Sequence, residues 1–547
     1  MRNKAVAGIF VVTLLMAGCE TGEEPAPEPD ADETETEAED AIARGGTIVV
    51  AISSDPGHLN PAITTSGATH TAAELLYNGL VELDDDLNPV PELATDWDVE
   101  DDGALYRFHL RDDVTWHDGE PFTSEDVRYS FEEVLTTLHS RTAASVGQAL
   151  DAIETPDDHT VEFHFTEPYA PLLLQLDVTE APIIPAHVYA GTDPEENPAN
   201  TNPVGTGPFR FVSYSPDEEI RLERNEDYFK EDLPYLDEVV MRVVPDDPSA
   251  VIALEAGEVD WLWNVPGPDL ERLQANDEVE LLTTDRNPGG SNCIMTLSFN
   301  LENPFFADVD VRRAIAHAID RDLYVEQILF GQGRVAEAPI ASGIAYAHGD
   351  VDLPDFDVEQ ADELLEAAGW QREGDGVRVA QGVDGVEDGT ALAFDFLHFP
   401  TFARYGELLR TQLAEVGIDL ELRPLEPPVF APTVFGDRDF DTNVISYCNG
   451  NDPEIGVRRQ IHSEQIGSVP FSNAAAYANP RVDELLDEAQ RTIDLDERGE
   501  LYQELQEILA EELPYVWIVE TEGTRAHSAF CDGFKPYSLF AEEAHCG

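Results

Sequence analysis

The chain has 547 residues, more than one compact core needs, so two or three domains are expected. Hydrophobic residues make up 42% and aromatic residues 9%, which excludes a mostly disordered chain. Aspartate and glutamate number 112 against 31 lysines and arginines, giving a net charge of −81; the lysines are Lys4, Lys230 and Lys535. Such a surface repels phosphate backbones and anionic lipid head groups, which excludes nucleic-acid binding.

The acid excess has two interpretations. In the first, the protein comes from a salt-rich environment, because the repulsion among so many like charges nearly disappears when the Debye length falls to about 3 Å at 1 M salt. This interpretation predicts a halophilic source and says nothing about function. In the second, the acidic surface steers cationic ligands toward the protein, which does concern function.

Residues 1–18 have the organisation of a signal peptide. Arg2 and Lys4 precede an apolar run over residues 5–16, which is too short to cross a bilayer core of about 30 Å. The sequence Leu-Met-Ala-Gly-Cys ending at Cys19 resembles the bacterial lipobox, which implies that Cys19 is lipidated and becomes the first mature residue. Ordinary secretion with an incidental cysteine is the alternative. We therefore expect a periplasmic or cell-surface protein held to the membrane by lipid alone.

Residues 19–44 are interpreted as the lipidated cysteine and an acidic linker. Eleven acidic residues, three prolines and no basic residue occur between positions 20 and 43, so the segment repels itself and cannot bury a core. An acidic interaction tail is the alternative interpretation.

The following segments predict strands and turns. A β-branched run over residues 46–52 ends at a Ser-Ser-Asp-Pro-Gly turn and predicts a strand. Alternating apolar residues around positions 106–110 and 161–165 predict half-buried strands between residues 80 and 200. The Trp-His-Asp-Gly stretch at 116–119 predicts a turn rather than a catalytic pair, and Thr123 is expected to cap a helix beginning near Ser124.

From about residue 300 the pattern alternates between helix and strand. Helical spacing predicts a helix over 311–323 ended by Gly331, and another over 402–416 ended by Gly417 and followed by a strand over 418–422. A third helical stretch begins near Val482 and breaks at Pro514, before an apolar strand over 516–519. The fold class is therefore mixed α/β.

The usual catalytic and metal motifs are absent from the sequence. It contains no H-E-x-x-H, G-x-S-x-G, P-loop or G-x-G-x-x-G motif, so we expect no enzyme, no cofactor and no metal site. Trp261 and Trp263 lie on one side of a predicted strand, where they either pack in a core or form a wall facing a ligand.

Four cysteines remain after Cys19: Cys293, Cys448, Cys531 and Cys546. An even number in an exported chain predicts two disulfides, for which three pairings are possible. The preferred pairing joins Cys531 to Cys546 in a short C-terminal loop and leaves Cys293 with Cys448.

Several ordered motifs resemble one family. They are PELATDW (91–97), DG (102–103), YRFHLR (106–111), VTWHDGEPFTSEDV (114–127), GTGPF (205–209), LEAGEVD (254–260), VRRAI (311–315), AIDR (318–321) and NPRVDEL (479–485). In this order they resemble the family 5 extracellular solute-binding proteins, which deliver peptides and, in some branches, nickel, opines or sugars to ABC importers. The resemblance covers residues 45–547.

The resemblance implies a type II periplasmic binding protein fold, with two lobes, an extra subdomain and a hinge that closes on ligand. We expect lobe I at residues 45–79, 203–290 and 521–547. The extra subdomain is expected at 80–202 and lobe II at 291–520. Relatives also carry a disulfide at positions that look like Cys293 and Cys448.

In peptide-binding relatives an Asp in the segment corresponding to residues 446–453 pairs with the α-amine of the peptide. Here Asn449 or Gly450 falls nearest that position, so a dipole replaces the charge. An arginine that grips the peptide carboxylate is likewise not matched near His398, and Arg404 is the closest candidate. The expected ligand-binding residues are therefore Tyr447, Cys448, Asn449, Asn451, Asp452, His398, Arg404, Trp261 and Trp263.

The function implied is that of a monomeric receptor that binds an oligopeptide or similar solute between its lobes and presents it to the transmembrane subunits of a permease. A nickel-chelate, opine or sugar receptor of the same family is the alternative, and an exported hydrolase is the alternative from a different class.

Overall fold

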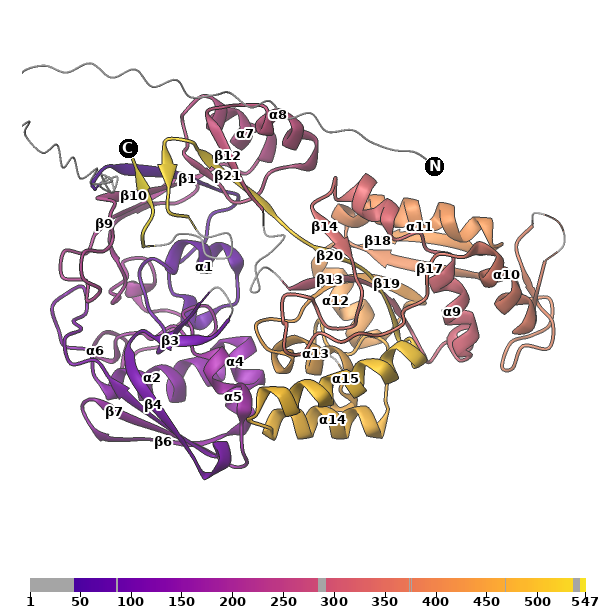
Figure 1. The fold of residues 1–547 in the computed structure, drawn as a ribbon, viewed down its shortest axis with the longest axis horizontal. Coiled ribbons are helices and arrows are strands. Elements are labelled where there is room, and N and C mark those ends of the chain that lie inside the picture. Colours follow the sequence, from indigo (N-terminus) through magenta and orange to yellow (C-terminus); the bar gives the residue numbers. More distant parts are fainter. Residues whose placement is uncertain are drawn as a thin grey trace, which may run out of the picture. The chain divides into compact units, whose positions relative to one another are not determined.

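The computed structural model describes residues 44–84, 87–283, 292–372, 374, 376–467, 469–534 and 542–547. The expected signal peptide, Cys19, the linker up to residue 43 and Lys535 lie outside the described residues. Three sheets organise the rest of the chain (Figure 1). We call the part built on the seven-stranded sheet lobe I, the part built on the six-stranded sheet lobe II, and the part built on the four-stranded sheet the subdomain.

The sheet of lobe I has the strand order β12-β21-β11-β1-β10-β9-β8. Its strands are β1 (Thr47–Ile52), β8 (Phe209–Ser215), β9 (Glu219–Arg224), β10 (Glu238–Val243), β11 (Trp261–Leu262), β12 (Val279–Thr283) and β21 (Thr524–Ser528). The predicted strand at 46–52 is confirmed as β1, which pairs in parallel with both β10 and β11. Its β-branched residues suit this central position, because both faces of the strand are covered.

The sheet of lobe II has the order β14-β20-β13-β19-β17-β18. Its strands are β13 (Cys293–Phe299), β14 (Gly333–Val335), β17 (Ala393–His398), β18 (Asp419–Pro424), β19 (Thr442–Cys448) and β20 (Tyr515–Thr521). Successive residues of β20 face opposite cores: Tyr515 and Trp517 pack on one side, and Val516 and Ile518 on the other.

Helices cover both faces of this second sheet. On one side lie α13 (Pro453–Ile461), α14 (Pro480–Arg491) and α15 (Leu495–Glu512), and on the other lie α9 (Val309–His317), α10 (Val358–Ala367) and α11 (Ala403–Glu415). Each helix contributes an apolar stripe at helical spacing, as the periodicity of the sequence predicts.

The subdomain sheet has the order β4-β5-β7-β6. Its strands are β4 (Ala94–Glu100), β5 (Leu105–Leu110), β6 (Leu150–Asp157) and β7 (Thr160–Phe165). The alternating patterns near 106–110 and 161–165 are thus confirmed as strands. Phe108 and Phe163 belong to the same hydrophobic cluster as Ile48 and Val50 of β1, so the subdomain and lobe I share one core.

The chain passes between the two large sheets twice. The first passage lies between Thr283 at the end of β12 and Cys293 at the start of β13, and the second lies between Thr521 of β20 and Thr524 of β21. The second connection is short, as the yellow strands β20 and β21 show in Figure 1. Two passages between lobes are what a hinged two-lobe protein requires.

Two of the predicted helices are interrupted in the structure at positions that the sequence pattern did not predict. The predicted helix over 311–323 ends at His317 in α9, because the carbonyl of His317 accepts a hydrogen bond from the amide of Asp357 instead of continuing the helix. The predicted stretch from Val482 to Pro514 divides into α14 and α15, because the side chain of Asp494 caps the amide groups of Asp496 and Glu497 and begins a new helix.

The turn at 116–119 and the helix after Thr123 are confirmed. The amide of Gly119 donates to the carbonyl of Trp116, and Thr123 with Asp126 forms a capping box at the start of α2 (Ser124–Tyr129). Both expected disulfides are also present: Cys293 is joined to Cys448, and Cys531 to Cys546.

Candidate ligand cavity

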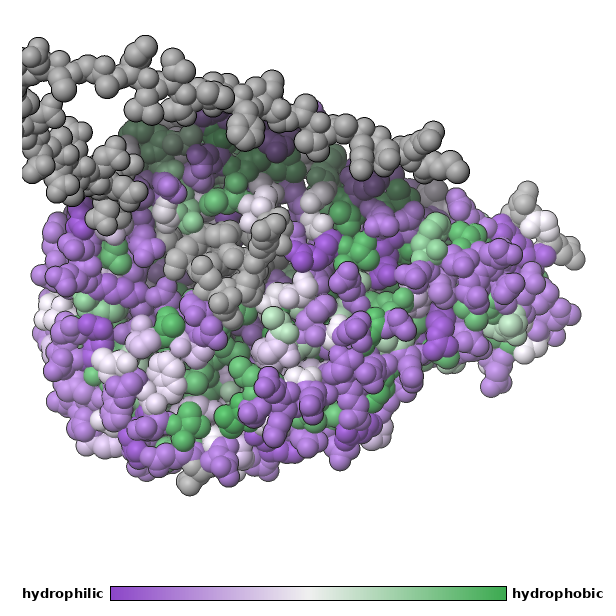
Figure 2. All heavy atoms as spheres, in the orientation of Figure 1, coloured by the Kyte–Doolittle hydropathy of each residue, from purple (hydrophilic) through white to green (hydrophobic). Residues whose placement is uncertain are grey.

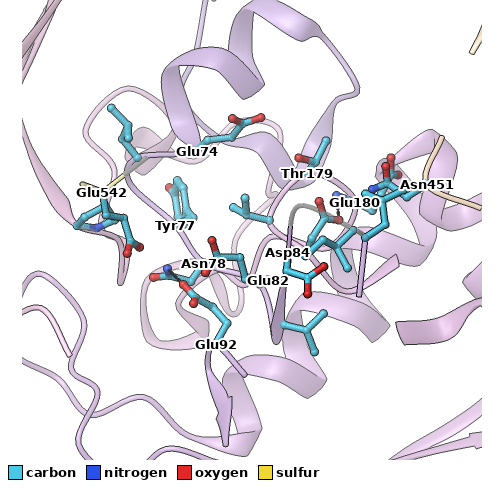
Figure 3. A pocket seen from close by; sticks show the side chains of 18 of the residues that line it. Glu74, Tyr77, Asn78, Glu82, Asp84, Glu92, Thr179, Glu180, Asn451 and Glu542 are labelled. Carbon is cyan, nitrogen blue, oxygen red and sulfur yellow. Dashed lines mark hydrogen bonds between the residues drawn. The ribbon is translucent and has the colours of Figure 1, made fainter. Parts of the chain in front are cut away.

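A cavity of about 710 Å³ is lined by residues of both lobes. The lobe I and subdomain side contributes segments between residues 74 and 92, residues 177–180, Arg141, Lys230, Trp263, Glu542 and Glu543. The lobe II side contributes Cys293, Cys448, Gly450 and Asn451. Its volume lies within the range of roughly 300–1,000 Å³ that is usual for ligand sites. Figure 3 shows the side chains that surround it.

Close backbone packing fixes the segment that lines one side. A side chain at Gly79 would meet the carbonyl oxygen of Leu176 at 2.3 Å, and one at Gly205 would meet the carbonyl oxygen of Leu76 at 1.7 Å. Only glycine permits these approaches. The GTGPF motif therefore holds residues 75–78 in place from one side, while the 176–178 backbone packs against Gly79, so Tyr77 and Asn78 are brought to the cavity.

Acidic side chains dominate the lining. Among the described residues that line the cavity, eight carry carboxylates and two carry cationic groups: Glu74, Glu82, Asp84, Glu92, Asp177, Glu180, Glu542 and Glu543 against Arg141 and Lys230. The carboxylates come from positions hundreds of residues apart. Six of them form two groups, which differ in how they are paired.

The first group surrounds Lys230. Its ammonium nitrogen lies 2.9 Å from Glu82, 2.6 Å from Glu92 and 3.1 Å from Glu542. Burial raises the pKa of Glu92 to about 8, against the opposing effect of Lys230. Burial acts to lower the pKa of Lys230, but the surrounding carboxylates raise it, so this lysine stays charged. A single cation thus serves three acids.

The second group contains Glu74, Asp177 and Glu180. Glu74 directly follows α1 (Gly67–Ala73), and the other two lie in the loop after Gln175. Arg141 donates from Nε to Glu180 over 2.9 Å. Burial and the charge of Asp177 raise the pKa of Glu74 to about 7, and burial and the charge of Glu180 raise the pKa of Asp177 to about 7.

The two tryptophans expected to act alike have different environments. Trp261 is fully buried in the core of lobe I, where its ring contacts those of His527 and Phe534. Trp263 is 37% exposed and lines the cavity, and the guanidinium of Arg525 lies 4.0 Å from the centre of its ring. Of the two alternatives left open for this pair, core packing applies to Trp261, which therefore does not line the cavity, whereas Trp263 does line it.

Of the segment expected to bind the ligand amine, only part reaches the cavity. Cys448 and Asn451 line it together with Gly450. Tyr447 is buried in lobe II and donates to the carbonyl of Ser472, and Asn449 is buried with its side-chain oxygen accepting from the amide of Ala341.

Asp452 is fully buried and bound by protein groups. Both of its carboxylate oxygens pair with Arg498 over 2.7 Å, the hydroxyl of Tyr346 donates to it, and it caps α13 through the amide of Glu454. These contacts give Asp452 a structural role in place of the expected contact with a ligand.

His398 and Arg404 also lie outside the cavity lining. His398 is buried at the end of β17, with Nδ1 lying 2.7 Å from the carbonyl oxygen of Phe399. Arg404 is exposed at the start of α11, where it donates to the carbonyl of Gln327 and lies over the ring of Phe330. The structure therefore gives both residues local packing partners.

Sequence reasoning missed the acidic lining. No motif marks Glu74 or Asp177, and the PELATDW motif contains Glu92 without indicating that it lines a cavity; they are three acidic residues among 112. Lys230 could have indicated the site, because lysines are rare in this sequence. In the structure this lysine pairs with three of the acids.

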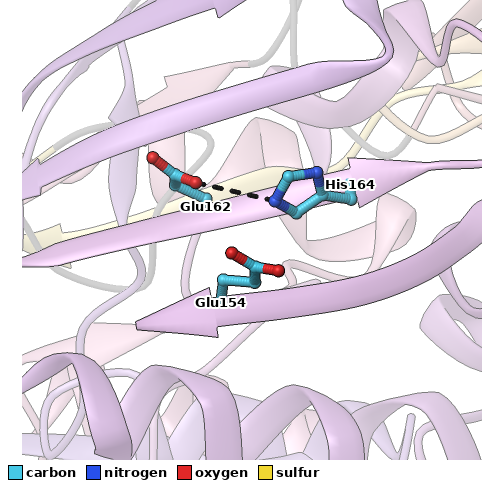
Figure 4. A group of neighbouring side chains, drawn as sticks. All are labelled: Glu154, Glu162 and His164. Atoms are coloured by element: carbon cyan, nitrogen blue, oxygen red, sulfur yellow. Dashed lines mark ion pairs between the residues drawn. The ribbon is translucent and has the colours of Figure 1, made fainter. Parts of the chain in front are cut away.

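A small cluster outside the cavity involves Glu154, Glu162 and His164 on β6 and β7 (Figure 4). Their ligand atoms lie within 4.8 Å of one another. The Glu162 carboxylate is also bound by Arg107 over 2.7 Å, so this cluster is an ion-pair network on the subdomain sheet.

Within the described residues, every helix is too short or too polar to cross a membrane.

Two lobes that the chain crosses twice, with a cavity lined by both, define a two-lobe binding protein of the type II fold. The family model of the bacterial extracellular solute-binding proteins, family 5, matches residues 88–465, and the chain belongs to this family. The family is extracellular, which places the protein in the periplasm or at the cell surface.

Relatives match along nearly the whole chain. The oligopeptide-binding protein AppA of Bacillus subtilis is 28% identical over 506 residues, covering 90% of this chain and 89% of the relative. Protein XP55 of Streptomyces lividans is 30% identical over 492 residues, covering 87% and 85%. The solved structure of AppA with a nonapeptide has a TM-score of 0.74 at 26% identity and covers 92% of this chain and all of that one (100%).

Proposed function

We propose that this protein is the substrate-binding receptor of an ABC importer and binds an oligopeptide in the cavity between its lobes. The observation that carries the proposal is the cavity itself, because residues of both lobes line it in a chain similar along its length to oligopeptide-binding proteins. The family's members bind solutes, and the protein is a receptor rather than an enzyme.

Because residues of both lobes line the cavity, a bound ligand contacts both lobes. A ligand bound by lobe I through residues 74–92 and by lobe II through Gly450 and Asn451 makes more contacts when the lobes are closed. It therefore shifts the population toward the closed form, in proportion to its extra affinity for that form. The permease then distinguishes the closed, loaded receptor from the open one.

The proposal for the membrane includes a lipid on Cys19, with residues 20–43 acting as a tether. The composition of this acidic segment supports an extended spacer between the lipid and the folded lobes. Export of a Cys19→Ser variant into the soluble fraction, with the parent protein remaining in the membrane fraction, tests this anchor. We further propose that the receptor works as a monomer.

A thermal-shift panel tests the ligand class. The mature protein is screened with oligopeptides, opines, oligosaccharides and nickel chelates, because a ligand that binds the native state raises its stability by RT ln(1 + [L]/Kd). Stabilisation by peptides alone supports the proposal. Stabilisation by another class, with peptides inactive, rejects the peptide assignment but retains the receptor. Turnover of a panel compound supports an exported hydrolase instead.

A further inference from the structure

We propose that the cavity selects cationic ligands, and that among oligopeptides it prefers those carrying a lysine or arginine side chain. This inference rests on the proposed function and names the ligand class of the same site. The argument uses the charge balance of the lining, the burial of its carboxylates and the apolar surface between them.

Acidic side chains outnumber cationic ones in the lining, and the residues that lobe II contributes to the lining are neutral. All eight carboxylates of the described lining come from lobe I and the subdomain, whereas Cys293, Cys448, Gly450 and Asn451 on the lobe II side are neutral. Lobe II brings one cation near the lining, because Arg459 of α13 acts electrostatically on Glu180. The lobe II residues that line the cavity supply no positive charge to the other acids. A cationic ligand supplies that charge.

Some acids of the cavity are buried, which distinguishes them from the solvent-exposed acids that make up most of the chain's negative charge. Salt screens solvated surface charges, but a carboxylate removed from water must be paired to avoid a large free-energy cost. The side chains of Glu92 and Glu180 are 6% and 10% exposed, so salt in the medium screens them little. An adaptation of the surface to salt gives no reason to gather such acids inside a ligand cavity.

Within the two groups of acids described above, Glu74 and Asp177 are the ones available to pair with a ligand cation. Glu82, Glu92 and Glu542 share Lys230, and Glu180 pairs with Arg141. The ion pairs found among the described residues do not include Glu74 or Asp177, although both lie beside the cavity and the charge of Asp177 raises the electrostatic cost of ionising Glu74. The side chain of Thr179 hydrogen-bonds to both carboxylates, and the charge of Arg525 partly offsets the repulsion at Glu74. A ligand cation placed between them relieves that repulsion.

Apolar residues complete the match to a basic side chain. The lining includes apolar groups beside the acids: Leu75, Val81, Leu83, Val178, Leu233 and the ring of Trp263. Lysine and arginine carry an apolar stem that ends in a cation, so they bury the stem on such a surface while the head pairs with carboxylates. Figure 3 shows Glu74, Glu82, Glu180 and Glu542 arranged around this space.

The test compares pentapeptides with identical termini that differ only at the central residue. The affinities of Ala-Ala-Lys-Ala-Ala, Ala-Ala-Arg-Ala-Ala, Ala-Ala-Ala-Ala-Ala and Ala-Ala-Glu-Ala-Ala for the mature protein are measured by calorimetry in 1 M KCl, a concentration at which long-range steering is screened to about 3 Å. We expect the Lys and Arg peptides to bind about tenfold or more tightly than the Ala peptide, and the Glu peptide to bind most weakly.

Spermidine and 1,5-diaminopentane separate this inference from the proposed function. If these amines bind while every peptide fails, the cation selectivity is supported and the peptide class is rejected. If the Ala or Glu peptide binds as tightly as the Lys peptide, the peptide class is supported and the cation selectivity is overturned. Failure of both amines and peptides overturns both.

Variants locate the selectivity. The double variant Glu74→Gln, Asp177→Asn keeps the side-chain shapes and removes the two charges, so we expect the preference for the Lys peptide over the Ala peptide to fall to about twofold or less. Glu195→Gln, at an exposed position outside the lining, is the control and keeps the full preference. An unchanged preference in a folded double variant overturns the assignment of Glu74 and Asp177, and the wild-type peptide series remains decisive if that variant does not fold.

Discussion

At the scale of single residues, Asp452 was expected to contact a ligand, but in the structure it forms a buried ion pair with Arg498. Asp452 is 0% and Arg498 1% exposed, and the pair is bidentate. Removing one partner of a buried pair leaves an unpaired charge in a region of low dielectric constant, which costs more than the pair contributes while intact.

We therefore predict that Arg498→Met lowers the free energy of unfolding by about 3–5 kcal/mol. Arg481→Met is the matched control, because Arg481 pairs with Glu484 and Glu504 at the surface, where loss of a pair costs about 1 kcal/mol or less. Denaturant unfolding of both variants in the same buffer measures the difference. Equal losses in the two variants would contradict a structural role for the Asp452–Arg498 pair.

At the scale of elements, the two disulfides brace different strand pairs. Cys293 and Cys448 stand opposite each other on β13 and β19, and their bond links positions 155 residues apart beside the cavity. Cys531 and Cys546 join β22 (Cys531–Asp532) to β23 (His545–Cys546) across 15 residues. In the chain-entropy model a longer loop restricts the unfolded chain more.

We predict that replacing Cys293 and Cys448 by serine destabilises the protein by about 5 kcal/mol, and that replacing Cys531 and Cys546 costs about 3 kcal/mol. The first variant also binds its ligand more weakly, because Cys448 lines the cavity. Unfolding midpoints and ligand affinities of the two double variants provide the comparison. A larger loss from the C-terminal pair would show that native-state strain, rather than loop length, governs these bonds.

The elements also show where sequence patterns predict structure well. The strands β1, β5 and β7 and the helix α11 follow from alternation or helical spacing, because each buries one or two faces in a regular way. The break after His317 does not follow from the pattern, because Ala318 and Ile319 continue the apolar spacing. In the structure α9 ends there, and the carbonyl of His317 accepts a hydrogen bond from the distant amide of Asp357. Local periodicity carries no information about such a partner.

At the scale of the whole molecule, the net charge of −81 predicts a strong dependence on salt. Hydrophilic residues cover most of the face shown in Figure 2. Like charges on a folded surface repel one another more than they do on an expanded chain, so screening stabilises the folded state.

We predict that the melting temperature rises by about 10 °C between 0.1 and 2 M KCl, a change equivalent to roughly 3–5 kcal/mol for domains of ordinary size. The affinity for ligand changes far less, because the cavity contacts are local and partly desolvated. Repeating the salt series at pH 4.5 supplies the control, since protonating carboxylates reduces the charge that salt screens. A melting temperature independent of salt at neutral pH would contradict the interpretation of the acid excess as an adaptation to salt.

The sequence by itself determined the class of the protein, several of its regular elements and the preferred pairing of its cysteines, because these depend on local periodicity, turn residues and ordered motifs. The tertiary structure alone decided which charges meet at the cavity. Glu74, Asp177, Lys230 and Glu542 come together only when lobe I, the subdomain and the C-terminal return are assembled, and burial separates these three acids from more than a hundred others. The same burial turned Asp452 from an expected ligand contact into the partner of Arg498, since a carboxylate without water needs a cation and only the fold determines which cation is near.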